Sequence, residues 1–239
     1  GDRQVQQRHG ESDRQGIDAG RHRQDHQGQA AGGILLALAL LLSAARRIAE
    51  SDRLIRQRKW IISWSPLFML GKSVYKSTLG IIGLGKIGKA VAKRARGFDM
   101  HILYHDSLRL TPEEENLLGV TFKSLEDLLK ESDFVSVHVP VTDETRLLFN
   151  EKRLRLMKPS AILINTSRGA TVDEAALIKA LQEKWIAGAA LDVYEKEPLS
   201  GDNPILDLDN VVLVPHIGSA TLEARTKMVE MAVLNLLSV

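Results

Sequence analysis

Cysteine is absent from the 239 residues of the sequence. Its absence excludes disulfide bonds, iron–sulfur clusters held by thiolates and catalysis by a thiol. It also fits a reducing compartment, so a cytoplasmic location is expected. No set of metal ligands is predicted.

An excess of one charge is absent as well. The 32 Lys and Arg residues nearly balance the 30 Asp and Glu residues, which leaves a formal net charge of +2. The two signs are interspersed, and this pattern does not form the basic patch that nucleic acid or an acidic membrane surface would attract. We therefore expect neither nucleic acid nor a membrane as a partner.

Long apolar runs are also missing. The one candidate, ILLALALLL at residues 34–42, is far shorter than the roughly 20 residues of a membrane-spanning helix. No basic segment with a small-residue cleavage site surrounds it, so a signal peptide is not predicted. The run is interpreted as the buried start of a helix that continues to about Trp60.

Residues 1–33 contain almost no large apolar side chains and show no helical or strand period. Such a segment cannot bury enough apolar surface to offset the entropy lost on ordering, which predicts a disordered or artefactual leader. A basic arm that binds nucleic acid is the alternative. The acids mixed into the segment, and its lack of aromatic residues for stacking, argue against that alternative.

From Thr78 onward, strand-like runs alternate with helical ones. The strand-like runs are TLGIIG, HILYHD, FVSVHVP, AILINTS, IAGAALDV and VVLVPH, and a closing helix follows from about Thr221 to Leu237. Among the helices between them, the one in TPEEENLLG has the clearest start, with Thr111 as N-cap before Pro112 and three acids. The alternation predicts an α/β fold with a doubly wound, mostly parallel sheet of the Rossmann type, whose core covers residues 78–214.

The sequence GLGKIG at 83–88 indicates a nucleotide-binding loop, because it directly follows a strand and opens a helix. Gly83 permits the tight turn, Gly85 lets the backbone approach a pyrophosphate, and Gly88 lets helix and strand pack closely. Lys86 and Ile87 complete the candidate loop at the helix N-terminus, where free N–H groups attract phosphate. An ordinary strand–helix turn is the alternative.

Asp106 follows the next strand, where an acid is expected to accept hydrogen bonds from the ribose hydroxyls of a dinucleotide. A carboxylate there would repel a 2′-phosphate, which favours NAD over NADP. A plain turn acid is the alternative. Because Arg109 lies nearby and could serve a 2′-phosphate, NADP remains possible as the cofactor.

From about Ile34 to its end, the chain resembles the D-isomer-specific 2-hydroxyacid dehydrogenases. The resemblance rests on GIIGLGKIGKAVAKRARGF, HVPVTDETRLLFN, LMKPSAILINTSRGATVDEAALIKAL, IAGAALDVYEKEP and LVPHIGSAT, which occur in the family's order and spacing. WSPLFMLG and HIGSAT make the glyoxylate/hydroxypyruvate reductases the most similar subgroup.

The resemblance implies three catalytic residues, namely Arg168 of NTSRG, Glu197 of EKEP and His216 of PHIGSAT. A guanidinium can grip the carboxylate and carbonyl of a 2-oxo acid. A histidine can supply the proton that the carbonyl oxygen needs after hydride transfer, and a carboxylate bonded to the imidazole fixes its tautomer and favours the protonated ring. Taken singly, Arg168 could cap a strand or pair with an acid, Glu197 could be a loop acid, and His216 a turn residue.

The resemblance also implies cofactor contacts at Val139, Pro140 and Thr145 of HVPVTDET, at Thr166, and at Asp192 of LDV. His138, which precedes Val139, is interpreted as a strand-end residue. The implied activity is NAD(P)-dependent reduction of glyoxylate or hydroxypyruvate to the D-2-hydroxy acid. A homodimer through a helix and dimer loop at 34–77 is implied too, with the catalytic-histidine turn and closing helix at 215–239.

One part of the family pattern is not found. The family's substrate domain, of roughly one hundred residues, precedes the stretch that begins at Ile34, and a segment beyond the last helix returns to it. Residues 1–33 show none of its strand–helix alternation, and the sequence ends at Val239. We therefore expect most of that domain to be missing and turnover to be impaired. The alternative is an NAD(H)-binding or interaction module, or a gene fragment, without efficient catalysis.

Overall fold

The computed structural model describes residues 33–237, so the leader predicted at 1–33 lies outside the described residues except for Gly33. The chain divides into two compact units, of which one is residues 34–218. The described part of the other is Gly33 and residues 219–237, most of which form helix α8 (Leu222–Leu237). None of the helices in the described part of the chain is long and apolar enough to cross a bilayer.

Unit 34–218 is built on a seven-stranded sheet in the order β3-β2-β1-β4-β5-β6-β7. Every neighbouring pair is parallel, which confirms the predicted doubly wound sheet. The strand order reverses between β1 and β4, which is where ligands bind in such sheets. The strands are β1 (Thr78–Ile82), β2 (His101–His105), β3 (Thr121–Phe122), β4 (Phe134–Val137), β5 (Ile162–Asn165), β6 (Gly188–Leu191) and β7 (Val211–Leu213).

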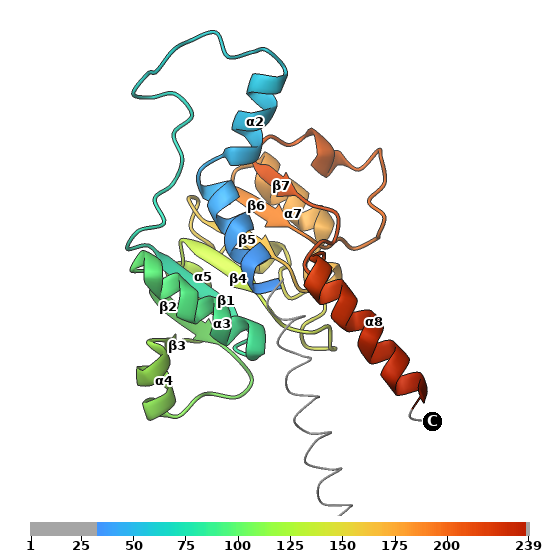
Figure 1. Cartoon of the computed structure of the whole chain (residues 1–239). Coiled ribbons are helices and arrows are strands. Elements are labelled where there is room, and N and C mark those ends of the chain that lie inside the picture. Colours follow the sequence, from blue (N-terminus) through green and yellow to red (C-terminus); the bar gives the residue numbers. More distant parts are fainter. Residues whose placement is uncertain (1–32, 238–239) are drawn as a thin grey trace, which may run out of the picture. The chain divides into compact units, whose positions relative to one another are not determined.

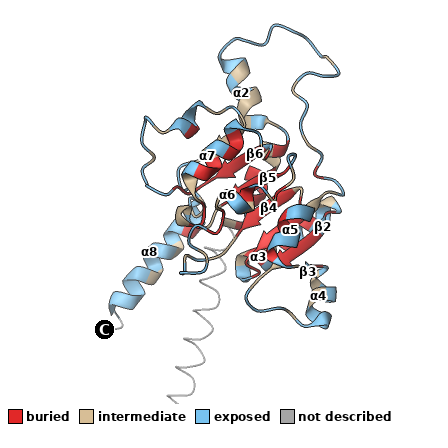
Figure 2. Ribbon diagram, turned by 180° about the vertical axis from the view of Figure 1, so that it is seen from behind, coloured by how far each residue is buried: buried red, intermediate tan, exposed pale blue. Residues whose placement is uncertain are grey.

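Helices cover both faces of this sheet. Helix α3 lies in front of the sheet in Figure 1, whereas α5, α6 and α7 come to the front in the reverse view of Figure 2. The central strands β1, β4, β5 and β6 are almost wholly buried, because both of their faces meet apolar helix surfaces. The helices are α3 (Lys86–Ala95), α4 (Pro112–Leu118), α5 (Leu125–Glu131), α6 (Glu151–Leu154) and α7 (Glu174–Gln182).

Local chemistry sets the start of α4 as predicted. The Thr111 hydroxyl accepts from the Glu114 N–H at 3.3 Å, and the Glu114 carboxylate accepts from the Thr111 N–H at 3.0 Å. This reciprocal capping, with Pro112 as the first helical residue, satisfies N–H groups that a helix start leaves free.

The prediction of one helix from residue 34 to about Trp60 was wrong. The structure has a helix over 33–45, a turn at residues 46–47, and then α2 (Ile48–Arg56). Arg47 adopts a left-handed conformation with φ of 53°, and its guanidinium binds Glu50 through Nε at 2.8 Å and Nη2 at 2.6 Å. The first helix is buried along one side, whereas α2 has no buried residue, so the chain changes direction where it leaves the core.

Candidate active site

The predicted site residues gather at one edge of the sheet. Because all neighbouring strands are parallel, their carboxyl ends meet at the same edge, and the candidate residues follow those ends. Gly83 comes after β1, Asp106 after β2, Val139 and Pro140 after β4, Thr166 and Arg168 after β5, Asp192 after β6, and His216 after β7.

The glycine loop between β1 and α3 is tight on one side and open on the other. Gly83 has φ of 91°, and a Cβ there would lie 2.8 Å from the His138 carbonyl oxygen. A Cβ on buried Gly88 would collide with the Gly83 carbonyl, whereas a Cβ on Gly85 would meet nothing within 4 Å. The loop therefore closes against β4 and α3 while the Gly85 backbone stays accessible.

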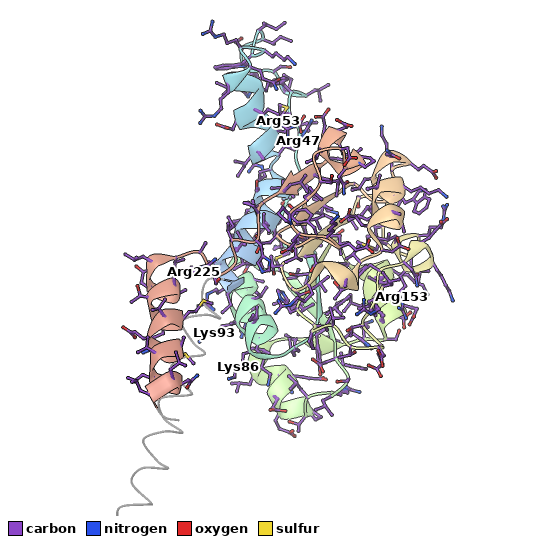
Figure 3. All side chains as sticks on the ribbon, turned by 90° about the vertical axis from the view of Figure 1, so that its right-hand side faces the viewer. Arg47, Arg53, Lys86, Lys93, Arg153 and Arg225 are labelled. Carbon is purple, nitrogen blue, oxygen red and sulfur yellow. The ribbon has the colours of Figure 1, made fainter. Side chains whose placement is uncertain are left out.

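The N-terminus of α3 faces the same open side. Its first helical hydrogen bond runs from the Lys89 N–H to the Gly85 carbonyl, so the preceding N–H groups remain for a ligand. Lys86 is exposed at the first position of the helix, and Figure 3 shows it at that end, with Lys93 further along α3. A free helix start beside an open glycine is suited to an anion.

Asp106 sits beside this loop at the end of β2. Its Oδ2 accepts from the Leu84 N–H at 2.6 Å, and its Oδ1 accepts from the Leu108 N–H at 3.1 Å. The carboxylate is thus fixed against the glycine loop, within the part of the site where a ribose is predicted. Its contact with a ribose stays a prediction.

The loop after β4 is closed by Thr145. The Thr145 hydroxyl donates to the Pro140 carbonyl at 2.6 Å and accepts from the Thr142 N–H at 2.7 Å, which ties the two ends of the turn together. At the strand end, the His138 Nε2 lies 2.9 Å from the Ser136 hydroxyl. Burial lowers the pKa of His138 to about 4, so its ring is neutral at pH 7.

Glu197 and His216 form a hydrogen-bonded pair. The His216 Nδ1 lies 2.7 Å from the Glu197 Oε2, and the Glu197 Oε1 accepts from the Tyr194 N–H at 3.0 Å. Burial acts to raise the pKa of Glu197, but the bonds from His216 and Tyr194 and the charge of Arg168 outweigh it, and the pKa is lowered. With Nδ1 engaged, Nε2 is the ring nitrogen that can exchange a proton with a substrate.

Asp192 holds the turn that carries His216. It is 1% exposed, and its two oxygens accept from the Ile217 N–H at 2.6 Å and the Gly218 N–H at 2.9 Å. His216 itself has φ of 52°, a conformation that costs a non-glycine residue free energy unless its surroundings enforce it. Burial raises the pKa of Asp192, while these two bonds oppose the rise. The predicted nicotinamide contact of Asp192 stays a prediction beside this positioning role.

Asn165, which was not predicted as a site residue, shapes the loop that carries Thr166 and Arg168. It is 1% exposed, and its amide nitrogen donates to the Arg168 carbonyl at 3.0 Å while its oxygen accepts from the Ser167 N–H at 3.0 Å. Arg168 is exposed, and its charge contributes to the lowered pKa of Glu197, so the guanidinium lies within electrostatic range of the pair.

Tyr194 is a second site residue that sequence reasoning missed. Its hydroxyl donates to the Val214 carbonyl at 3.0 Å, and burial raises its pKa to about 12, which keeps the hydroxyl protonated. A Cβ on Gly169 would collide with the Tyr194 carbonyl, so the Arg168 loop packs directly on the Glu197 loop. No local signal marks Asn165 or Tyr194, because their partners are carbonyl and N–H groups whose positions the fold alone decides.

A hollow of about 570 Å³ adjoins the Glu197–His216 pair. Pro198, Leu199, Leu213 and Pro215 give it apolar walls. Within residues 33–237, no group of three His, Asp or Glu side chains is placed to hold a metal ion. The described side chains can attract an anion through Arg168 and exchange a proton at His216.

The sequence of this chain was compared with protein-family models and with known proteins. Residues 38–218 match the family model described as D-isomer specific 2-hydroxyacid dehydrogenase, NAD binding domain. The chain is 56% identical over 202 residues to the glyoxylate reductase of Korarchaeum cryptofilum, which covers 84% of this chain and 60% of that protein. The chain thus spans about three fifths of the length of the curated relatives it matches.

Two solved structures are similar in fold as well as sequence. The TT0316 protein from Thermus thermophilus is 46% identical with a TM-score of 0.82, over 88% of this chain and 65% of that one. The NADPH-dependent glyoxylate/hydroxypyruvate reductase from Sinorhizobium meliloti, in complex with NADP and malonate, is 36% identical with a TM-score of 0.78. That match covers 87% of this chain and 64% of the reductase.

Proposed function

The chain belongs to the D-isomer specific 2-hydroxyacid dehydrogenase family, as its motifs predicted, and we propose that it binds NAD(H) and reduces a small 2-oxo acid to the D-2-hydroxy acid. Glyoxylate or hydroxypyruvate is the proposed substrate. The observation that carries this proposal is the Glu197–His216 pair, which lies with Arg168 at the same sheet edge as the open glycine loop.

The residues present fit a dinucleotide. The accessible Gly85 backbone and the start of α3 suit the pyrophosphate, and the Asp106 carboxylate suits the ribose next to it. Val139, Pro140, Thr145, Thr166 and Asp192 would border the remainder of the cofactor. When bound, NADH supplies the hydride.

The chain's own side chains supply the polar part of the reaction. Arg168 attracts the substrate carboxylate and can also donate to its carbonyl oxygen, because its guanidinium offers two donors in one plane. His216 gives a proton from Nε2 to that oxygen as the carbonyl is reduced. Glu197 keeps the ring oriented through Nδ1 and stabilises the charged ring, and Asp192 fixes the turn on which the ring is carried.

Solvent exposure limits how well this arrangement works alone. The His216 side chain is 51% exposed and Arg168 is exposed too, so water screens their attraction for a substrate. A substrate held loosely also loses the benefit of fixed geometry. We therefore expect residues 1–239 to bind NADH but to turn over glyoxylate slowly.

Cofactor binding is tested first, by fluorescence titration of the full chain with NADH. Saturable binding that Gly85→Val abolishes is the expected result. Gly97→Val is the matched control, because a Cβ at Gly97 also meets nothing within 4 Å. Gly97 lies in η1 (Arg96–Phe98), at the far end of α3. If NADH binding is absent, or survives Gly85→Val, the proposed site is wrong.

Catalysis is tested by NADH oxidation with glyoxylate, followed at the absorbance of the reduced cofactor. His216→Ala and Arg168→Ala are each expected to lower the rate by about a hundredfold or more, the scale of a lost general acid. His101→Ala, at the exposed start of β2, is the control. If the chain binds NADH but shows no turnover that depends on His216, the proposed catalysis is wrong and the chain acts as a nucleotide-binding module.

We also propose a homodimer formed through residues 48–75. Apolar side chains are strongly exposed there, including Ile61 at 87%, Trp64 at 85% and Leu67 at 79%. They lie on the long loop that leads from α2 toward β1 (Figure 1), and Trp64 also lines a hollow of about 960 Å³. Soluble monomers rarely expose so large an apolar patch, and a second copy would cover it.

Light scattering at several concentrations tests the dimer. Trp64→Lys should shift the protein toward monomer, whereas Leu117→Lys, at an equally exposed leucine of α4, should not. A parent chain that is monomeric at every concentration would contradict the proposal. The cytoplasmic location stays a prediction, which cell fractionation would test.

A further inference from the structure

Arg109 lies in the loop after β2, three positions beyond Asp106. Its side chain is 61% exposed, yet Nε donates to the Glu115 Oε1 at 3.0 Å and Nη2 donates to Oε2 at 3.4 Å. The guanidinium carbon also lies 5.1 Å from the centre of the Phe122 ring. An arginine beside the ribose acid is the residue type that would receive a 2′-phosphate, but this one is already occupied.

The carboxylate of Glu115 is held in place by a hydrogen bond from Tyr104. The hydroxyl of the fully buried Tyr104 donates to Glu115 Oε1 at 2.9 Å and accepts from the Leu110 N–H at 2.8 Å. The Glu115 side chain is only 13% exposed, and the bonds from Arg109 and Tyr104 lower its pKa, so it stays ionised. Tyr104 belongs to β2 and Glu115 to α4, which stands beside the β2–β3 end of the sheet in Figure 1.

The charges of Asp106, Arg109 and Glu115 disfavour a 2′-phosphate on the ribose of the bound dinucleotide. Asp106 and Glu115 each carry one negative charge, and Arg109, which lies between them in sequence and bonds Glu115, carries one positive charge. A 2′-phosphate would bring about two further negative charges to a group that is already net negative. Asp106 repels it directly, and Glu115 withholds the cation that could offset that repulsion.

We propose that Glu115 is a specificity-determining positioning residue, which holds Arg109 away from the adenosine ribose and so makes the site reject 2′-phosphorylated dinucleotides. This inference rests on the proposed nucleotide site. Glu115 does not touch the cofactor in this arrangement and acts only through Arg109.

The test is fluorescence titration of the full chain with NADH and with NADPH at one low ionic strength. Glu115→Gln keeps an oxygen that accepts from Tyr104 but removes the charge that holds Arg109. It should tighten NADPH binding about fivefold, the ratio that corresponds to about 1 kcal/mol for a partly exposed ion pair. NADH binding should change less than about twofold.

Adding Arg109→Met to Glu115→Gln should abolish the gain, because the freed guanidinium is its source. Arg109→Met in the parent should move the NADPH-to-NADH ratio less than it does in the Glu115→Gln background. Glu151→Gln is the matched control, since it removes one charge from another Arg–Glu pair, in which Glu151 of α6 lies 2.9 Å from Arg155 just after that helix. It should leave the ratio unchanged.

The outcomes separate the two proposals. If the parent binds NADH and Glu115→Gln leaves the ratio unchanged, the inference is wrong and the proposed function stands. A gain that persists after Arg109→Met, or equal weakening of both nucleotides, also overturns it, because Glu115 would then act only as a loop anchor. If no variant binds either nucleotide, both proposals fall. Should Glu115→Gln not fold, a large loss of NADPH binding in Arg109→Met alone would overturn the inference.

Discussion

His138 makes the stability of this fold depend on pH in a predictable way. It follows β4, and its carbonyl oxygen lies against Gly83 of the candidate nucleotide loop. Burial lowers the pKa of His138 from 6.5 to about 4. The unfolded chain, where the ring is hydrated, binds the proton near pH 6.5. Between these two values the unfolded state therefore holds more protons than the folded state.

The pKa difference between the folded and unfolded states fixes the sign and size of the change in unfolding free energy with pH. A depressed folded-state pKa contributes stability that is fully present above pH 6.5 and is lost as the pH falls through 6.5 toward 4. With about 1.4 kcal/mol for each pH decade, the parent should lose about 2 kcal/mol of unfolding free energy by about pH 5 from this group alone. The lowered pKa values of Glu115, Asp133 and Glu197 act at lower pH and act equally in a variant at position 138.

The assay is urea unfolding, followed by circular dichroism at pH 7 and pH 5. His138→Gln keeps an amide that can meet the Ser136 hydroxyl but cannot take up the proton. Its unfolding free energy should fall less than the parent's between the two pH values, by about 2 kcal/mol. His101→Gln replaces an exposed histidine and is the control. It shows whether the effect comes from the burial of His138 or from replacing any histidine. Equal losses in the parent and His138→Gln would refute the reasoning.

Three further changes test individual parts of the site. Gly88→Ala should cost about 1–3 kcal/mol in urea unfolding, because its Cβ would collide with the Gly83 carbonyl. Gly85→Val should leave that unfolding free energy within about 1 kcal/mol of the parent's, since the space above Gly85 is open, while NADH titration is lost. Asn165→Ala should cost about 1–3 kcal/mol, because it leaves buried partners of the Arg168 loop unsatisfied, and proteolysis within residues 166–171 should accelerate.

Much of the fold could be predicted because its signals are local. The strand–helix alternation from Thr78 onward predicted the parallel sheet, and the Thr111 cap with Pro112 predicted a helix start. Each of these signals depends on residues that are close together in the sequence. The glycine spacing at 83–88 likewise depends on one turn. The pairing of Glu197 with His216 did not come from local signals. It came from the family resemblance, since the two residues lie 19 positions apart.

What the sequence could not show is long-range or depends on exposure. The break at residues 46–47 arises where a helix leaves the core, and an uninterrupted run without Pro or Gly gave no warning of it. The bond between Asp192 and the backbone at Ile217 joins positions 25 residues apart. The Arg109–Glu115 pair is close in sequence, but its role depends on Tyr104 beneath it.

These long-range contacts share one arrangement, which explains how an exposed edge can carry an ordered site. At this edge Arg168 and His216 are exposed and Glu115 is partly buried. In each case a buried polar side chain binds the nearby backbone or, for Glu115, the carboxylate itself. Asn165 lies below Arg168, Asp192 below the His216 turn, and Tyr104 below Glu115. Loops at such an edge would otherwise sample many conformations, because few apolar contacts restrain them. Breaking the bonds of a buried polar side chain leaves polar groups unsatisfied, so these bonds restrain the loop that they hold. Removing the hydrogen bonds of Asn165, Asp192 or Tyr104 should therefore broaden the range of positions of the side chain that each one holds. The chemistry of that side chain should not change.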